Sequence, residues 1–314
     1  MPVTYTPLRY PGGKTQLTPF VLDMIRSNGL LRGVYAEPFA GGAGIAWRLL
    51  LNGDVSEVWL NDIDPAIYAF WQTVVFEPDP LCERILKIEI TMEEWERQRL
   101  VLKDASATQQ DLAFAVLFLN RTNRSGILKG GVIGGKAQTG NYKLDCRFNR
   151  PELIHKIQRI HTYREVIKIT RMDAEECLIK WNKSLPQKSL VNIDPPYYAQ
   201  GRDLYLSFYH PEDHKRLAEL IRGLECKWML TYDDVPEIEE LYKGLPSYRK
   251  GLTYYAQVKR KASELLVLSK RLIAPTELLH SGAIPLGKDS VLINIEHKDN
   301  LIKINNEENE LDFA

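Results

Sequence analysis

The chain has 314 residues, 44% of them hydrophobic, and its 41 Lys and Arg residues balance 41 Asp and Glu residues. This composition suits one substantial core with a smaller inserted or appended domain, and it excludes disordered, collagen-like and coiled-coil chains. No secretory signal is visible, and no apolar run approaches the roughly 20 residues that span a bilayer. The four cysteines are scattered, as in reduced thiols rather than a zinc site. We therefore expect a cytoplasmic protein without a membrane segment.

Strand-like and helix-like patterns alternate through most of the sequence. In chain order they are a helix with Leu17, Val21, Met24 and Ile25 on one face, strands over 33–39 and 57–62, a helix that begins near Pro65, strands over 165–170 and 189–194, a helix with Leu217, Leu220, Ile221 and Leu224, and strands over 227–232 and 263–269. Such alternation predicts an α/β fold in which helices cover both faces of a sheet.

One region breaks this alternation. Residues from about 78 to about 160 are mostly helical by pattern and include a glycine-rich loop. We therefore predict a discontinuous catalytic domain over 1–80 and 161–271, a helical insert over 81–160, and a C-terminal extension over 272–314. The extension could form a hairpin that turns near residues 298–300, or a loose tail.

The charge is uneven along the chain. Residues 121–171 include twelve Lys and Arg residues but only three acids, and residues 249–271 include seven Lys and Arg residues but only one acid, Glu264. Such stretches are typical of phosphate-binding surfaces, and equally of solvated helix faces.

Two motifs together favour a nucleoside-containing cofactor. In "AEPFAGGAG" (36–44), a strand ends in an acid and a glycine-rich turn opens a helix, so main-chain N–H groups can approach a ligand. About 20 residues later "NDID" (61–64) ends the next strand, where an acid commonly holds ribose hydroxyls.

The stretch "RYPGGKT" (9–15) is not a nucleotide phosphate loop. That motif needs a glycine where this chain has Leu8. Lys14 could instead pair with a carboxylate, and Tyr10 could pack on a ligand.

The stretch "DPPYY" (194–198) ends an apolar strand with an acid, two prolines and two aromatic rings. The prolines push the preceding residues to extended backbone and remove two N–H donors. The Asp194 carboxylate and the Pro195 carbonyl then present two acceptors, which is what an exocyclic amine needs. Tyr197 supplies a face on which a planar base can stack. The motif therefore predicts chemistry on an amino-bearing ring.

The ordered motifs "RYPGGK", "EPFAGGAG", "NDID" and "DPPYY" resemble the Dam-type (D12 class, alpha group) family of DNA N6-adenine methyltransferases over about residues 8–270. The resemblance implies a seven-stranded, Rossmann-like sheet, S-adenosylmethionine as methyl donor without a metal, and a helical target-recognition domain before the D-P-P-Y motif. The catalytic residues that it implies are Asp194, Pro195, Pro196 and Tyr197. The cofactor-binding residues are Tyr10 and Lys14 at the methionine end, Glu37, Pro38, Phe39, Gly41 and Gly44 in the main cradle, Asp62 at the ribose, and Asp173 near the adenine.

The same resemblance implies double-stranded DNA as the partner. The implied DNA contacts are Arg121, Asn123, Arg124 and Lys129 in and after "LNRTNRSG", and Lys259, Arg260 and Lys261 in "VKRKASELL". The family's DNA loop often carries an aromatic wedge, whereas this chain has Thr122 and Asn123 there. We expect a monomer or weak dimer, and the motifs suit both a partner of a restriction endonuclease and a solitary enzyme.

The alternatives share parts of this chemistry. A cytosine-N4 methyltransferase uses the same amine chemistry, but the motif order and the Asp before P-P-Y favour adenine. An enzyme acting on RNA or a protein amide would more often have Asn at that position. An inactive DNA-binding homologue would be expected to lose the glycines or the D-P-P-Y residues, and both are present.

Overall fold

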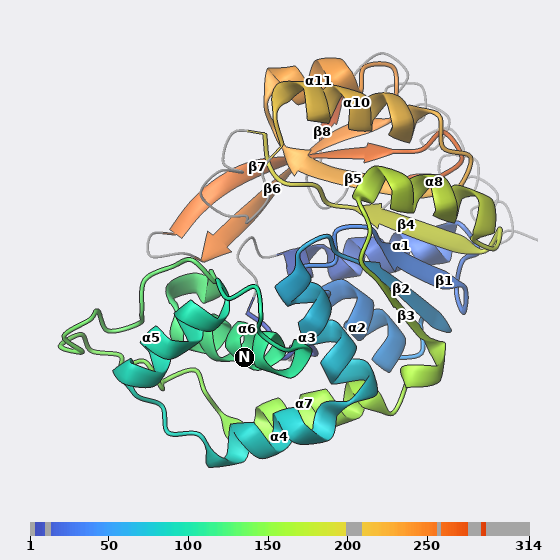
Figure 1. The fold of residues 1–314 in the computed structure, drawn as a ribbon. Helices are drawn as coiled ribbons and strands as arrows, with labels where there is room; N and C mark the ends of the chain where they lie inside the picture. The colour runs from blue at the N-terminus through green and yellow to red at the C-terminus, as the bar shows by residue number, and fades with distance from the viewer. Residues whose placement is uncertain (1–3, 10–13, 199–208, 256–258, 276–283, 287–314) are drawn as a thin grey trace, which may run out of the picture.

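The computed structural model describes residues 4–9, 14–198, 209–255, 259–275 and 284–286. In this part of the chain one sheet lies between layers of helices, and the helical insert gathers at one end of it (Figure 1). In chain order the elements are η1 (Lys14–Leu17), α1 (Thr18–Ser27), β1 (Val34–Glu37), α2 (Gly44–Leu51), β2 (Glu57–Asn61), α3 (Pro65–Phe76), α4 (Pro78–Lys87), α5 (Met92–Val101), α6 (Gln109–Thr122), η2 (Arg124–Gly126), α7 (Arg150–His161), η3 (Arg164–Val166), β3 (Ile167–Thr170), α8 (Ala174–Ser184), β4 (Ser189–Ile193), α10 (Pro211–Arg222), β5 (Trp228–Asp233), α11 (Pro236–Leu241), β6 (Ser247–Tyr255), β7 (Lys259–Leu268) and β8 (Ile284–Leu286).

The sheet order is β3-β2-β1-β4-β5-β7-β6-β8. The first five strands are parallel, and β7, β6 and β8 are antiparallel to their neighbours. From β1 the chain runs to β2 and β3 on one side and later to β4 and β5 on the other. The strand order therefore reverses between β1 and β4, and in open α/β sheets ligands bind outside the carboxyl ends of the strands at such a point.

Alternation along the strands builds a core on each face. On β1, Tyr35 contributes to the core formed with α1, α2, α3, α6 and α7, while Val34 and Ala36 contribute to the core formed with α8, α10 and α11. Successive side chains of a strand point to opposite faces, which is why one short strand serves both layers. The predicted α/β sheet with helices on both faces matches this arrangement.

The insert packs against the rest of the molecule through α6 and α7. Residues 113–119 of α6 are all fully buried, and they belong to the same core as α3 and the sheet. The insert and the sheet thus share one continuous core, and the 81–160 boundary stays a prediction. None of the described helices combines the length and the apolar composition needed to cross a bilayer.

The sequence patterns missed two strands. β6 pairs with β7 over nine residue pairs, although Arg249, Lys250 and Gly251 interrupt its apolar pattern. β8 comes from the predicted C-terminal extension and pairs with β6, so part of that extension joins the sheet. The described residues form eight strands rather than the expected seven. The predicted hairpin near 298–300 lies outside the described residues.

Candidate active site at the carboxyl edge of the sheet

Four of the predicted acids follow the ends of neighbouring parallel strands. Glu37 ends β1, Asp62 follows β2, Asp173 lies three residues after β3, and Asp194 follows β4. Because carboxyl ends of parallel strands share one edge, these residues from distant parts of the sequence lie along one side of the sheet. Glu37 and Asp194 flank the β1–β4 reversal.

Glu37 is a buried carboxyl group, with 5% of its surface exposed. The Tyr35 hydroxyl donates a 2.9 Å hydrogen bond to its Oε1. The pKa of Glu37 is raised to about 8, mainly by burial and also by the nearby Asp194, while hydrogen bonds from Tyr35 and Asn192 oppose the shift. The buried Oδ1 of Asn192 has no hydrogen-bond partner among the described residues. Glu37, Asn192 and Asp194 together form an acceptor-rich cluster that suits a cationic group such as an α-ammonium.

The glycine turn holds the acid of the next strand. Gly41 has φ +44°, and its N–H donates to Oδ2 of Asp62 at 2.9 Å, while the Asp64 N–H donates to Oδ1 at 3.0 Å. Burial raises the pKa of Asp62 to about 7. Helix α2 begins at Gly44 directly after this turn. The turn thus positions a partly buried carboxyl group, a suitable acceptor for sugar hydroxyls.

Asn61 ties three strand ends together, although the sequence analysis gave it no role. Its Nδ2 donates to the carbonyls of Pro38 (3.1 Å) and Met172 (3.0 Å), and its Oδ1 accepts from the Met172 N–H (3.0 Å). Asn61 is buried, so these bonds fix the relative positions of the glycine turn and the segment that leads to Asp173. The sequence feature that could have indicated this role is the position of Asn61 at a strand end, next to Asp62.

An aromatic chain links the cofactor motif to the D-P-P-Y motif. The half-buried ring of Phe39 lies edge-on to Tyr209 at 6.2 Å, Tyr209 lies 5.5 Å from His214, and His214 lies 5.0 Å from Tyr198. Burial raises the pKa of Tyr209, and the nearby Asp173 carboxylate raises it further. Phe39, Tyr209 and Asp173 thus lie near one another and form a candidate surface for a planar ring.

The D-P-P-Y segment is held by side chains of β5 and β7. Thr231 Oγ1 donates to Asp194 Oδ1 at 2.8 Å, and the Tyr197 hydroxyl donates to Glu264 Oε1 at 2.6 Å. The Tyr198 N–H donates to Asp233 Oδ1 at 2.9 Å.

Asp233 and Glu264 face each other in the β5–β7 register. Two opposed carboxylates therefore each accept a hydrogen bond from one of two consecutive tyrosines. Nothing in the local sequence around 194–198 indicates Thr231, Asp233 or Glu264 as partners, because they lie 35 or more residues away.

The predicted DNA loop differs in its two halves. Arg124 and Lys129 are exposed. Burial raises the pKa of Asp64, and the nearby charge of Lys129 is among the groups that oppose this shift, so the loop lies near the cofactor motif. Asn123, in contrast, is fully buried; its Nδ2 donates to the carbonyls of Ile127 and Leu128, and its Oδ1 accepts from Trp95 Nε1. In this structure Asn123 therefore shapes the loop and presents no surface to DNA.

Three arginines, Arg9, Arg121 and Arg147, gather beside this loop, and Glu152 offsets part of the charge of Arg121. Arg121 Nε donates to the Pro7 carbonyl at 2.8 Å. The pKa of Arg121 is lowered to about 10, mainly by burial and also by Arg9 and Arg147, while Glu152 opposes the shift. The pKa of Arg9 is likewise lowered by burial and by Arg147. Mutual repulsion of this kind is relieved by an anion, so the cluster suits a phosphate. Arg9 had no role in the sequence analysis.

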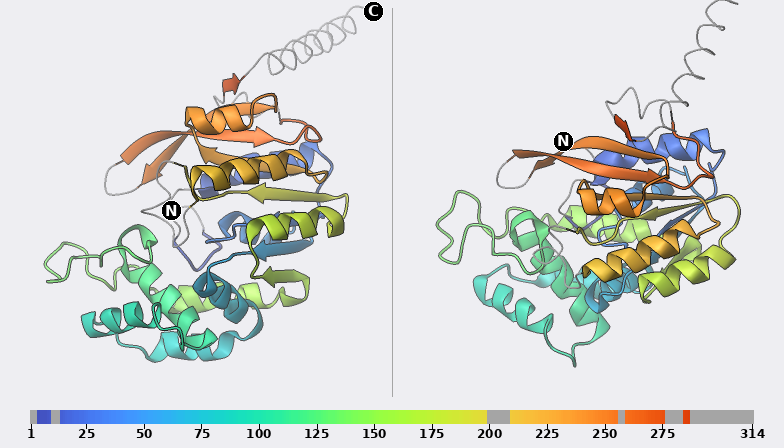
Figure 2. Two further views of the ribbon diagram at one scale, coloured as in Figure 1. Left: turned by 45° about the horizontal axis from the view of Figure 1, so that its top comes forward. Right: turned by 90° about the horizontal axis from the view of Figure 1, so that it is seen from above.

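Some predicted residues lie outside what the structure describes. These are Tyr10 and the side chains of Lys14, Lys259, Arg260 and Lys261. The β6–β7 hairpin itself projects past the sheet on the side of the insert (Figures 1 and 2). Among the described residues no cluster of three or more His, Cys, Asp or Glu side chains is arranged to hold a metal.

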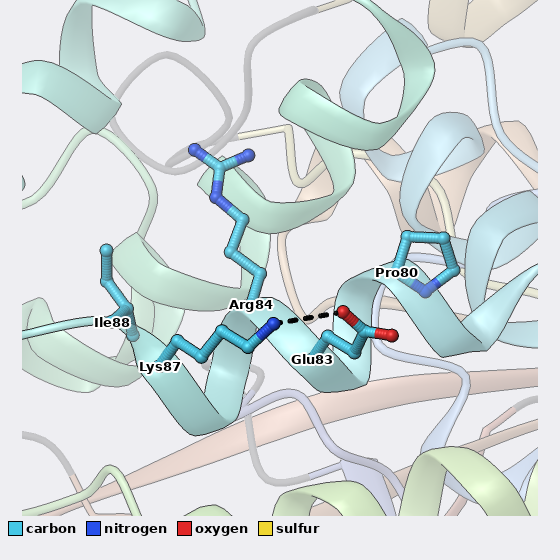
Figure 3. A pocket seen from close by; sticks show the side chains of 5 residues that line it. All are labelled: Pro80, Glu83, Arg84, Lys87 and Ile88. Atoms are coloured by element: carbon cyan, nitrogen blue, oxygen red, sulfur yellow. Dashed lines mark hydrogen bonds and ion pairs between the residues drawn. The ribbon is translucent and has the colours of Figure 1, made fainter.

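A surface hollow on α4 is separate from these motifs. It has a volume of about 380 Å³ and is lined by Pro80, Glu83, Arg84, Lys87 and Ile88 (Figure 3). Its cations are paired, Lys87 with Glu83 at 3.2 Å and Arg84 with Asp111 at 3.1 Å. None of the residues that line this hollow belongs to the predicted motifs. The candidate active site is therefore the carboxyl edge of the sheet, where the predicted acids lie.

Several known proteins are similar to this chain. The chain is similar to the Type II methyltransferase M.MjaIII of Methanocaldococcus jannaschii, with 25% identity over 265 residues that cover 76% of this chain and 87% of that protein. Among solved structures it is similar to the rRNA methyltransferase aviRa from Streptomyces viridochromogenes, with 14% identity, a TM-score of 0.36, and coverage of 83% of this chain and 86% of that one. It is also similar to protein LPL1258 from Legionella pneumophila strain Philadelphia 1, with 10% identity, a TM-score of 0.31, and coverage of 81% and 85%.

Residues 10–259 match the family described as D12 class N6 adenine-specific DNA methyltransferase. The resemblance inferred from the motifs and the Rossmann-like, mostly parallel sheet are thereby confirmed. Because the match covers more than half of its length, the chain belongs to the D12 class N6 adenine-specific DNA methyltransferase family.

Proposed function

We propose that this protein transfers a methyl group from S-adenosylmethionine to N6 of an adenine flipped out of duplex DNA. Family membership implies S-adenosylmethionine as the donor and DNA as the substrate. The observation that carries the finer proposal is the position of Asp194 and Pro195 beyond β4, beside the β1–β4 reversal and across from Glu37. Base flipping follows from the geometry of a duplex, because a stacked adenine cannot bring its N6 to groups at the edge of a sheet.

The residues present fit the cofactor. The acceptor cluster of Glu37 and Asn192 would bind the α-ammonium group, and Asp62 would accept hydrogen bonds from the ribose hydroxyls. Phe39 and Asp173 would border the adenine, with Tyr209 beside them. Main-chain groups of the 38–44 turn, including Pro38, Gly41 and Gly44, would shape the cradle. When bound, S-adenosylmethionine supplies an electrophilic methyl group on a sulfonium.

The protein's part in the reaction is to orient the amine. The Asp194 carboxylate and the Pro195 carbonyl would accept the two N6 hydrogens, which favours a pyramidal nitrogen with its lone pair directed at the methyl group. Pro195 and Pro196 fix the backbone, and Tyr197 would stack on the base. Such positioning can supply about 7–11 kcal/mol of a reaction barrier. N6 loses one proton as it gains the methyl group, and the Asp194 carboxylate, which would accept an N6 hydrogen bond, would be the group that receives it.

The DNA side of the proposal is supported by charge. Arg9, Arg121 and Arg147 repel one another beside the loop that carries Arg124 and Lys129. Phosphates neutralise such clusters, and phosphate contacts fix the register of a protein on a duplex. We further propose that Lys259, Arg260 and Lys261 on the β6–β7 hairpin meet phosphates. The relative's designation as a Type II methyltransferase suggests that a restriction endonuclease reads the same site.

The test is transfer of labelled methyl from S-adenosylmethionine to unmethylated genomic DNA, with wild type, Asp194→Ala and the exposed-loop control Asp104→Ala. We expect N6-methyladenine in one recurrent short motif, located by single-molecule sequencing, with Asp104→Ala active and Asp194→Ala inactive. Label on cytosine would assign the protein to cytosine-N4 chemistry. An Asp194→Ala variant as active as wild type would disprove the role of Asp194.

A further inference from the structure

The segment of residues 4–9, here called the N-terminal segment, is anchored to the glycine turn. Thr6 is buried, and its Oγ1 donates a 2.7 Å hydrogen bond to the carbonyl of Gly42. Leu8 is part of the main hydrophobic core. The chain continues from this segment directly into residues 10–14, which carry the predicted cofactor contacts Tyr10 and Lys14.

The other end of the segment is anchored to the DNA loop through Asn120, a buried residue of α6 with 2% of its surface exposed. The Arg9 N–H donates to Asn120 Oδ1 at 2.7 Å, and Asn120 Nδ2 donates back to the Arg9 carbonyl at 2.7 Å. The same Nδ2 group donates to the Gly126 carbonyl at 2.9 Å. A Cβ atom on Gly126 would lie 2.2 Å from the Arg9 carbonyl oxygen, so the two main chains are in direct contact.

Asn123 offers an internal comparison, because it is a second buried asparagine that holds the same loop. Its side-chain partners are Trp95, Ile127 and Leu128, all within the insert. Its main-chain carbonyl accepts from Arg9 Nη1 at 3.2 Å, a contact that a side-chain substitution keeps. The side chain of Asn120 thus connects the loop to the N-terminal segment, while that of Asn123 connects the loop to the insert.

We infer that Asn120 is a positioning residue that fixes two things at once, the N-terminal segment leading to the cofactor contacts and the loop facing DNA. This inference rests on the proposed function. Asn120 uses both its acceptor and its donor group, and only a carboxamide supplies both in this shape. In Asn120→Asp the Nδ2 donor becomes an oxygen that faces the carbonyls of Arg9 and Gly126, so two hydrogen bonds become repulsive contacts.

The experiment measures two affinities for wild type and three near-isosteric variants, Asn120→Asp, Asn123→Asp and Thr6→Val. The affinity for S-adenosylhomocysteine without DNA is measured by titration calorimetry. The affinity for a short labelled duplex that carries the mapped site is measured by fluorescence anisotropy. We expect Asn120→Asp to weaken both affinities by about tenfold or more. Asn123→Asp should weaken only DNA binding, and Thr6→Val only S-adenosylhomocysteine binding.

The inference is overturned if Asn120→Asp is folded and binds S-adenosylhomocysteine within about twofold of wild type. If Asn120→Asp does not fold, Gly126→Ala tests the same contact from the loop side and should also weaken S-adenosylhomocysteine binding; unchanged binding would overturn the inference. If wild type binds S-adenosylhomocysteine and methylates DNA, and the variants do not differ from it, the inference about Asn120 is wrong while the proposed function stands. If wild type neither binds S-adenosylhomocysteine nor methylates DNA, both the proposed function and the inference are wrong.

Discussion

The hydroxyl of Thr231 on β5 donates a 2.8 Å hydrogen bond to Oδ1 of Asp194, 37 residues earlier in the chain. This bond sets the rotation of the carboxylate that is proposed to accept an N6 hydrogen. A hydrogen bond to a charged group contributes about 1.5–3 kcal/mol. The geometry of the proposed acceptor therefore depends on a neighbouring strand as well as on the prolines that follow Asp194.

Thr231→Val should lower kcat by about 10- to 100-fold, the equivalent of losing such a bond in the transition state. Thr231→Ser keeps the hydroxyl and should retain most of the activity. Binding of S-adenosylhomocysteine should be unchanged in both variants. Steady-state methyl transfer and calorimetry check this, and a fully active Thr231→Val would show that the bond does not orient Asp194 during catalysis.

Tyr197 should contribute through its ring more than through its hydroxyl. Tyr197→Phe keeps the stacking face but removes a donor from Glu264, which is 1% exposed. We expect a lower melting temperature and a loss of kcat of about tenfold or less. Tyr197→Leu should also lose about 1–3 kcal/mol of stacking.

The readouts are thermal unfolding, kcat, and the fluorescence of 2-aminopurine at the target position, which reports base flipping. Tyr163→Phe, between α7 and η3, serves as the control and should leave all three unchanged. If Tyr197→Leu flips and methylates the base as well as Tyr197→Phe does, the proposed stacking is wrong.

The raised pKa values of Glu37 and Asp62 should make the cofactor-free protein less stable at higher pH. The pKa of Glu37 is raised from 4.5 to about 8 and that of Asp62 from 3.8 to about 7, both mainly by burial. The folded state therefore retains protons that the unfolded state releases, and the free energy of unfolding should fall as the pH rises from 3.8 to about 8.

Glu37→Gln removes one of these ionisations while keeping the shape of the side chain. The variant should be more stable than wild type at pH 8, by about 1–3 kcal/mol, and should show a smaller decline with pH. It should also bind S-adenosylhomocysteine more weakly. Urea unfolding at several pH values checks this, with Asp104→Asn as an exposed control. An unchanged pH profile in Glu37→Gln would show that Glu37 is not the titrating group.

Arg147 should contribute to DNA affinity through phosphate contact. Each neutralised phosphate contributes about 0.9 to the slope of log K against log salt for B-form DNA. Arg147→Ala should therefore lower that slope by about 0.9 and weaken specific and non-specific duplexes alike. The control is Lys183→Ala on α8. Lys183 and Arg147 are both exposed, and the Lys183 variant should leave the slope unchanged. An identical slope for Arg147→Ala and wild type would remove Arg147 from the interface.

The sequence by itself was sufficient to predict the local devices of the site. Two prolines constrain the backbone after Asp194, glycines permit the positive φ at Gly41, and acids stand where strands end. Apolar periodicity placed β1, β2, β4 and β5, because strands buried on both faces form short apolar runs bounded by polar residues. These features depend on near neighbours in the chain, so a single sequence carries them.

Only the tertiary structure decided which distant groups meet. Thr231 with Asp194, Glu264 with Tyr197 and Asn120 with Arg9 are joined by pairing and packing across dozens of residues. β6 likewise owes its existence to β7, since its own sequence is interrupted by charge and glycine. Burial also separated Asn123, which shapes the DNA loop from inside, from its exposed neighbour Arg124. Register and burial are properties of the whole fold, and local rules do not encode them.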